Sequence, residues 1–263
     1  MVLVHGLWTT PLIWEHWVTH YAAQGFRVLA PAWPGVEREV EDLRTDPSSL
    51  AGVGLEAVLD RYEGIVRRLD RPPILIGHSF GGTIVQLLLD RGLGVAGVAL
   101  HSAAVKGVRP LPLSTLRSTW PILRRPGLRD EASGLTFEQF RYAFANTLSM
   151  REAAVAYDRY HVPGPARVLF QGAFANFSPR AITRVDFSND RRAPLLFIAG
   201  GEDHIVPPVV NRANARLYQR SAALTEYLEF PGRSHLTVSQ EGWQEVADHA
   251  MRWVLNRALL LKT

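Results

Sequence analysis

The chain has 263 residues, 47% hydrophobic and 21% charged, which is the composition of an ordinary globular protein with one α/β domain and an insertion. It contains no cysteine, which excludes disulfides, thiolate nucleophiles and cysteine metal sites. The net charge is +4, but the arginines are scattered and form no basic stripe, so we expect no nucleic-acid partner. No apolar run approaches a membrane span and no signal peptide is visible, so we expect a cytoplasmic protein without membrane contact.

The first predicted strand, residues 2–4, is followed by a His-Gly pair. Gly6 would let the backbone turn close to a substrate, and we expect His5 to brace this loop. The N–H group of Leu7 would then be free to stabilise a carbonyl oxygen as it becomes an anion.

The next elements alternate between helix and strand. Thr10 and Pro11 have the capping hydroxyl and first-turn proline of a helix start, and Gly25 marks its end. In chain order we predict a helix at 12–23, a strand at 26–30, a polar loop to about 46 and a helix from about 47 to 69.

Residues 77–81, Gly-His-Ser-Phe-Gly, are the most informative segment. A strand-like apolar run at 73–76 precedes them, and an apolar helix at 83–91 follows. A serine at such a strand-to-helix turn is lifted above the sheet edge on a strained backbone. We therefore predict that Ser79 is a nucleophile and that the Phe80 N–H group is the second oxyanion donor.

A nucleophilic serine needs a base, and the base needs an orienting acid. The turn after a predicted strand at 193–200 offers Asp203, which we prefer to Glu202 because its shorter side chain is easier to hold rigidly. A strand at 226–230 leads to His235, the predicted base, and a helix from about 240 closes the chain. Ligands of open α/β sheets bind at these carboxyl ends of strands.

The other histidines have weaker interpretations. We expect His78 to pack beneath the turn and His204 to point away from the acid, while His16 and His20 lack the sequence of a zinc-protease helix. The sequence suggests no partner for the last three, which are His101, His161 and His249.

These motifs, in this order, resemble those of the α/β-hydrolase superfamily. The resemblance implies an α/β fold with a mostly parallel sheet, helices on both faces and a helical cap insertion. Members usually have two antiparallel strands before the His-Gly strand, and this chain starts directly on that strand. Either the family's first hairpin is absent or the start is truncated, and in both cases we expect about six strands. We predict a hydrolase core at 1–102 and 193–263, and a cap at 103–192, called the cap segment below.

The cap segment is predicted to open with a proline-rich loop and to contain helices that begin near Thr136, Ser149 and Ser178. Aromatic residues could line the substrate pocket beneath it. The predicted substrate-binding residues are Trp8, Trp120, Phe140, Phe144, Phe170 and Phe174.

The function that fits these features is a serine esterase acting through an acyl-enzyme on small, partly hydrophobic esters or lactones, with no metal or organic cofactor. Two alternatives use the same residues: a cofactor-free perhydrolase or amidase, and a non-catalytic small-molecule receptor. Ser79 argues against epoxide hydrolases and haloalkane dehalogenases, which carry aspartate there. Leu236 argues against hydroxynitrile lyases, which carry lysine after the catalytic histidine. The sequence makes no prediction of oligomeric state.

Overall fold

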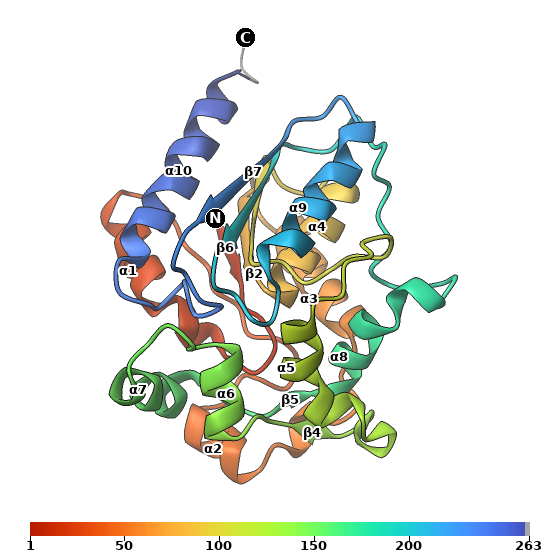
Figure 1. Ribbon diagram of the computed structural model, residues 1–263. Coiled ribbons are helices and arrows are strands. Elements are labelled where there is room, and N and C mark those ends of the chain that lie inside the picture. The colour runs from red at the N-terminus through yellow and green to blue at the C-terminus, as the bar shows by residue number, and fades with distance from the viewer. Residues whose placement is uncertain (261–263) are drawn as a thin grey trace.

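The computed structural model describes residues 1–260, and its centre is a five-stranded parallel sheet in the order β1-β2-β3-β6-β7 (Figure 1). Because every pair of neighbours is parallel, all five strands end at the same edge of the sheet. The strands are β1 (Val2–Val4), β2 (Ile74–His78), β3 (Ala96–Leu100), β6 (Leu195–Gly200) and β7 (Thr225–Phe230).

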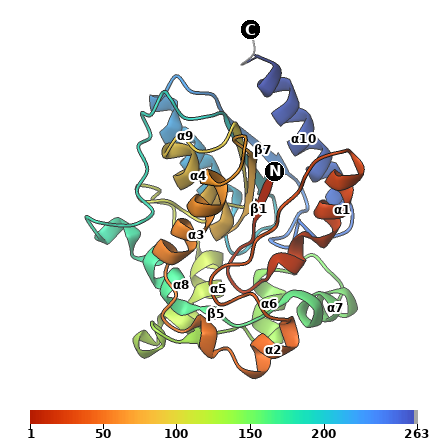
Figure 2. The same ribbon diagram turned by 180° about the vertical axis from the view of Figure 1, so that it is seen from behind.

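Helices cover both faces of this sheet, which confirms what the resemblance implies (Figures 1 and 2). One layer holds α1 (Glu15–Ala23) and α10 (Trp243–Leu260), which are joined where the Tyr21 hydroxyl donates to the Ala247 carbonyl at 2.9 Å. The opposite layer holds α3 (Leu55–Arg67), α4 (Phe80–Asp90) and α9 (Pro208–Leu217). With both faces covered, β1, β3 and β6 are buried along their whole length and consist almost wholly of apolar residues.

The predicted strand at 26–30 is reduced to a single bridge, so the sheet has five strands where we expected about six. Leu29 alone pairs in parallel with Val2, through Leu29 N–H to the Met1 carbonyl and Leu3 N–H to the Leu29 carbonyl. The Phe26 N–H group instead bonds to the Tyr21 carbonyl at the end of α1, and Pro31 has no N–H group to donate. Pairing therefore stops on both sides of Leu29.

The N-terminal helices follow the predicted order with different boundaries. Thr10 does cap the first helix, accepting the Leu12 N–H at 3.2 Å, but a 3₁₀ turn (Pro11–Trp14) precedes α1. The predicted loop contains an unexpected helix, α2 (Val40–Thr45), and α3 begins after Gly54 instead of near residue 47. Asp46 explains why α3 begins later than predicted, because its carboxylate accepts the Ser48 N–H and closes a local turn.

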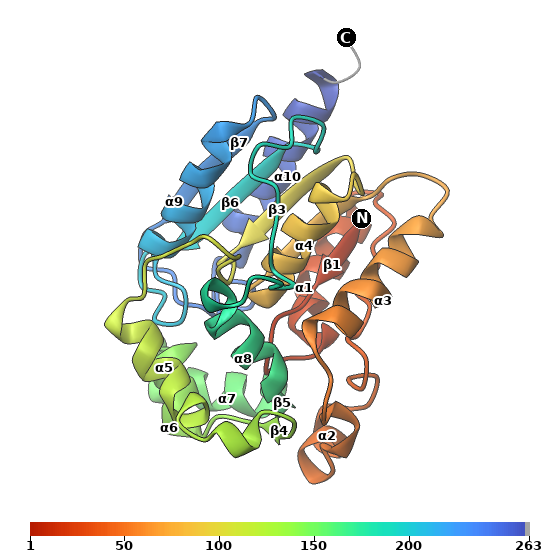
Figure 3. The ribbon, with the colours of Figure 1, turned by 90° about the vertical axis from the view of Figure 1, so that its right-hand side faces the viewer.

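The cap segment adds no strand to the main sheet, and its helices lie beyond the end where the strands finish (Figure 3). Its last residues run back to the opposite end of the sheet, where Asp186 and Asn189 bond to Asp90 at the end of α4. Helices begin after Thr136 and Ser149 as predicted, and the capping box expected at Ser149 forms, with a second one at Thr136. Two expectations were wrong: the proline-rich stretch contains a helix with Pro121 in its last turn, and residues after Ser178 form turns, where the Ser178 carbonyl accepts the Lys106 ammonium at 2.6 Å. The elements are α5 (Leu113–Leu123), β4 (Ala132–Ser133), α6 (Phe137–Ala143), α7 (Met150–Tyr160), β5 (Gly164–Pro165) and α8 (Ala166–Ala173).

None of the helices within residues 1–260 combines the length and the apolar character that crossing a bilayer requires.

Candidate active site

The turn between β2 and α4 holds Ser79 in a left-handed conformation, with φ 57° and ψ −123°. Glycines on either side make this turn possible. A Cβ on Gly77 would lie 2.1 Å from the Gly81 carbonyl oxygen, and a Cβ on Gly81 would lie 2.0 Å from the Val4 carbonyl oxygen. Neither position has room for a side chain, because the backbone segments of this turn lie in close contact. The tight turn lifts Ser79 above the edge of the sheet.

Left-handed backbone at residues other than glycine is confined to this edge. Within residues 1–260 three such residues exist, Trp8 (φ 67°), Ser79 and His101 (φ 48°). Ser79 directly follows β2 and His101 directly follows β3, while Trp8 lies in the loop after β1. Strained backbone of this kind clusters at functional sites, so the three adjacent strands together mark one.

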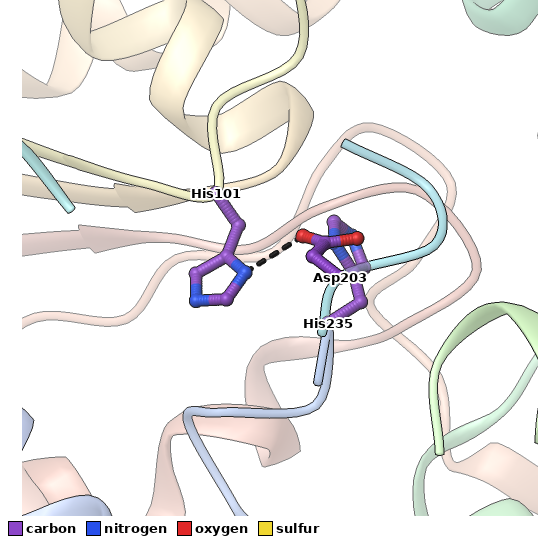
Figure 4. A group of neighbouring side chains, drawn as sticks. All are labelled: His101, Asp203 and His235. Carbon is purple, nitrogen blue, oxygen red and sulfur yellow. Dashed lines mark hydrogen bonds and ion pairs between the residues drawn. The ribbon is translucent and has the colours of Figure 1, made fainter. Parts of the chain in front are cut away.

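Two imidazoles converge on one carboxylate at the same edge. His235 Nδ1 and His101 Nδ1 each lie 2.7 Å from Oδ2 of Asp203. His101 reaches it from the end of β3, while His235 comes from the loop after β7 (Figure 4). All three side chains are fully buried.

The other oxygen of Asp203 is equally well satisfied, since Oδ1 accepts the Ile205 and Val206 N–H groups, each at 2.8 Å. Burial by itself would raise the pKa of the Asp203 carboxyl, but His235 and the hydrogen bonds from both imidazoles hold that pKa far below its usual range. Asp203 is therefore a fixed anion. Glu202, the rival acid of the sequence analysis, is exposed, and none of these groups binds to its carboxylate.

His78 connects the serine turn to the loop that carries His235. Its Nε2–H donates to the His235 carbonyl at 2.8 Å, and the two rings lie 4.6 Å apart between centroids. Burial, and then the two neighbouring histidines, lower the pKa of His78 well below its ordinary value, so it is a neutral donor. This packing brings His235 beside the residue that precedes Ser79. Nε2 of His235 is buried and has no hydrogen-bond partner within the described residues.

The loop after β1 passes directly over the serine, since a Cβ on Gly6 would lie 2.8 Å from Ser79 Cβ. His5 braces this loop: its Nδ1–H donates to the Gly6 carbonyl, and its Nε2 accepts the Trp33 N–H at 3.1 Å. Burial lowers the pKa of His5 to about 4, so the ring stays neutral. Within residues 1–260 the Leu7 N–H group donates no hydrogen bond, which leaves it free in this loop.

The comparisons with known proteins identify the family of this chain. A family model described as the alpha/beta hydrolase family matches residues 1–249. The chain belongs to the alpha/beta hydrolase family. A search of curated protein sequences found no significant match.

Solved structures similar to this family member share its fold at low sequence identity. A thermophilic esterase from Thermogutta terrifontis matches with a TM-score of 0.69 and 19% identity, over 98% of this chain and 89% of the other. An extracellular alpha/beta-hydrolase from a Paenibacillus species has a TM-score of 0.68 and 20% identity, over 95% and 97%. A monoacylglycerol lipase from Paleococcus ferrophilus has a TM-score of 0.67 and 21% identity, over 97% and 93%.

The six aromatic residues predicted to bind substrate occupy different environments in this α/β hydrolase. Phe144, which follows α6 in the cap segment, lies nearly perpendicular to the His235 ring, with centroids 4.9 Å apart. Trp8 packs edge-on against Phe144, and Phe140 stacks on it from the cap core. Phe170 is buried in α8, but Trp120 and Phe174 are 58% and 51% exposed. Only Phe144 among the six therefore makes a ring contact with His235 within the described residues.

The remaining histidines have structural partners. His20 Nε2 lies 2.7 Å from Asp248 Oδ1, so the His16–His20 spacing is not a metal pair. His161 accepts the Leu135 N–H at 3.0 Å, and His204 donates to the Tyr142 carbonyl at 2.9 Å.

The His-Asp-His cluster has the composition of a metal centre, with its ligand atoms within 4.8 Å of one another. However, Asp203 already accepts four N–H groups. A hydrogen-bonded network therefore accounts for the whole cluster.

Sequence reasoning missed His101. One signal was available: it directly follows the strand that neighbours the serine strand, as Ser79 follows its own. Its partner Asp203 lies 102 residues further along the chain.

Proposed function

We propose that this protein is a serine hydrolase that cleaves carboxylic esters, with Ser79 as nucleophile, His235 as base and Asp203 as orienting acid. The observation that carries the proposal is the buried bond between His235 Nδ1 and Asp203 Oδ2, 2.7 Å long, at the same sheet edge as a strained serine whose preceding residue, His78, packs against His235. This bond fixes the tautomer in which Nδ1 holds the proton. The unpartnered Nε2 is then the basic nitrogen that a serine hydroxyl requires.

The cycle would be acyl transfer to water. His235 takes the proton of Ser79 as its oxygen attacks the carbonyl carbon, and the Leu7 and Phe80 N–H groups stabilise the oxyanion. His235 then gives that proton to the leaving alcohol. Water attacks the acyl-enzyme in a second round of the same steps, releasing the acid and the free serine.

The surroundings of the site favour a small, partly hydrophobic ester or lactone. Ser79 is only 5% exposed, and the Phe144 ring presents an apolar surface to His235. Gly172 of the cap segment lies so close to Phe80 that a Cβ there would be 2.7 Å from the ring. Space above the serine is thus limited by apolar groups, which exclude water and disfavour charged substrates. The esterase and the lipase among the similar structures support the same reaction class.

The experiment that tests this function is steady-state hydrolysis of p-nitrophenyl esters of graded acyl length, followed by lactones and amides. Replacing Ser79 by alanine (Ser79→Ala) is expected to lower kcat by about 10⁶-fold while leaving the fold intact. Ser49→Ala is the matched control, because the Ser49 hydroxyl only donates to the Gly35 carbonyl on the surface. Saturable binding without turnover in the wild type would instead identify a receptor, and retained turnover in Ser79→Ala would refute the nucleophile.

A further inference from the structure

His101 is a buried titratable residue to which the proposed cycle gives no step. Its Nδ1 contacts the same oxygen of Asp203 as His235 does, at the same distance of 2.7 Å. Because the pKa of Asp203 is held low, the carboxylate is ionised and can only accept, so each imidazole must donate from Nδ1. Burial lowers the pKa of His101 against the raising effect of that hydrogen bond, which keeps the ring neutral.

Two features show that the fold is arranged around this imidazole. His101 has a left-handed φ of 48°, which a residue with a side chain adopts only under strain. Gly200, at the end of β6, leaves the space for its ring, since a Cβ there would lie 2.4 Å from His101 Cε1. The strained backbone of His101 and the absence of a side chain at Gly200 are both needed to direct the His101 ring at Asp203.

We propose that His101 is a positioning residue of the active site, whose Nδ1–H fixes the Asp203 carboxylate and weakens its pull on the His235 proton. A carboxylate oxygen that shares its charge between two donors attracts either one less strongly than it would attract one donor alone. His101 thereby holds the acid in place and keeps His235 a weaker base than a single His–Asp pair would make it. This inference rests on the proposed function.

The charged and titratable groups that face the cluster are few. His78, from the end of β2, is neutral, and its ring lies 5.8 Å from that of His101 between centroids. Arg233, two residues before His235, acts on His101 through its charge. A substitution of residue 101 leaves both His78 and Arg233 in the protein. A change in the titration of His235 in such a variant therefore reports a change at the Asp203 carboxylate, which the two imidazoles share.

The test compares two variants at this position. In His101→Asn the amide nitrogen stands where Nδ1 stood, which keeps the donor, whereas His101→Leu keeps the bulk and removes the donor. In His101→Leu we expect the acid limb of the kcat/KM profile to move up by about 0.5 to 1 pH unit, with the Asn variant close to wild type. Equal movement in both variants, or none in a folded Leu variant, would overturn the proposal.

A measurement on the wild type does not depend on how the variants fold or on finding a substrate. In protein labelled with ¹⁵N-histidine, NMR should show His101 protonated at Nδ1 and two downfield imidazole N–H signals, one each from His101 and His235. His101 protonated at Nε2 would contradict the proposal. If no ester is turned over, the proposed function fails, but these signals still report whether the network exists.

Discussion

A single methyl group added to the cap segment should weaken catalysis without touching a catalytic side chain. In Gly164→Ala the new Cβ would lie 2.7 Å from Leu7 Cδ1 and 3.1 Å from the Trp8 nitrogen. Non-bonded carbons prefer about 3.5–4.0 Å. The Leu7 side chain can rotate away, but the Trp8 nitrogen is backbone and belongs to the peptide that follows Leu7. The loop that carries the proposed oxyanion donor must therefore move.

The cap segment holds this loop from two sides, so the loop cannot move freely. The Trp8 indole donates to the Ser133 carbonyl at 2.9 Å, and the Trp8 carbonyl accepts the Val162 N–H at 3.0 Å. Ser133 is also the register partner of Gly164 in the β4–β5 pair. A side chain at Gly164 would therefore displace the peptide between Leu7 and Trp8.

The size of the effect follows from the loss of one oxyanion donor, which costs about 10²–10³-fold in kcat. Displacing a donor by a few tenths of an ångström weakens the bond without removing it, so we expect kcat to fall by about 10- to 100-fold. KM should change little, because this contact strengthens only in the transition state.

Steady-state kinetics with p-nitrophenyl acetate, together with urea unfolding, measures both quantities. Gly127→Ala is the matched control, because a Cβ at Gly127, also in the cap segment, meets no atom within 4 Å. A folded Gly164→Ala protein with wild-type kcat would refute the idea that the cap segment sets the oxyanion loop. An equal loss in Gly127→Ala would make the effect non-specific.

Two further predictions concern stability. Gly81→Ala places a Cβ 2.0 Å from the Val4 carbonyl oxygen, so urea unfolding should show a loss of about 3 kcal/mol or more, and an unchanged midpoint would contradict the tight turn. Burial lowers the pKa of His161 to about 3, so the unfolded chain takes up a proton that the folded chain refuses, and stability falls as pH drops from about 6.5 towards 3. Between pH 7 and pH 5 this residue should account for about 2 kcal/mol. His161→Gln, which retains an acceptor for the Leu135 N–H, should remove that part of the pH dependence.

The parts of the fold that the sequence predicted are those with local causes. The serine turn depends on glycines two residues away on each side. The loop that carries Asp203 follows an apolar run, and the loop that carries His235 follows a strand of mixed polar and apolar residues. The capping boxes at Thr136 and Ser149 are equally local.

What could not be predicted depends on contacts between distant segments. The strand predicted at 26–30 does not form, because pairing at the sheet edge depends on which carbonyl groups of neighbouring segments are placed to accept its N–H groups. The direction in which His101 points depends on a left-handed backbone and on the space left by Gly200, neither of which a periodic pattern reveals. The predicted aromatic lining shows the same limit, since Trp120 in α5 and Phe174 just after α8 are exposed while Phe144 lies against His235.

The roles of the three central histidines follow from how each uses its nitrogens. His78 donates from Nε2 to the His235 carbonyl, so this nitrogen already carries a proton and cannot act as a base, and the bond joins the serine turn to the His235 loop. His101 and His235 both donate from Nδ1 to an anion that four N–H groups stabilise inside the protein. A buried charge without partners would be prohibitive, so these donors are the condition for keeping Asp203 ionised. Because that anion is so well stabilised, in the proposed cycle it does not take the proton itself, and the proton from the serine stops at His235 Nε2.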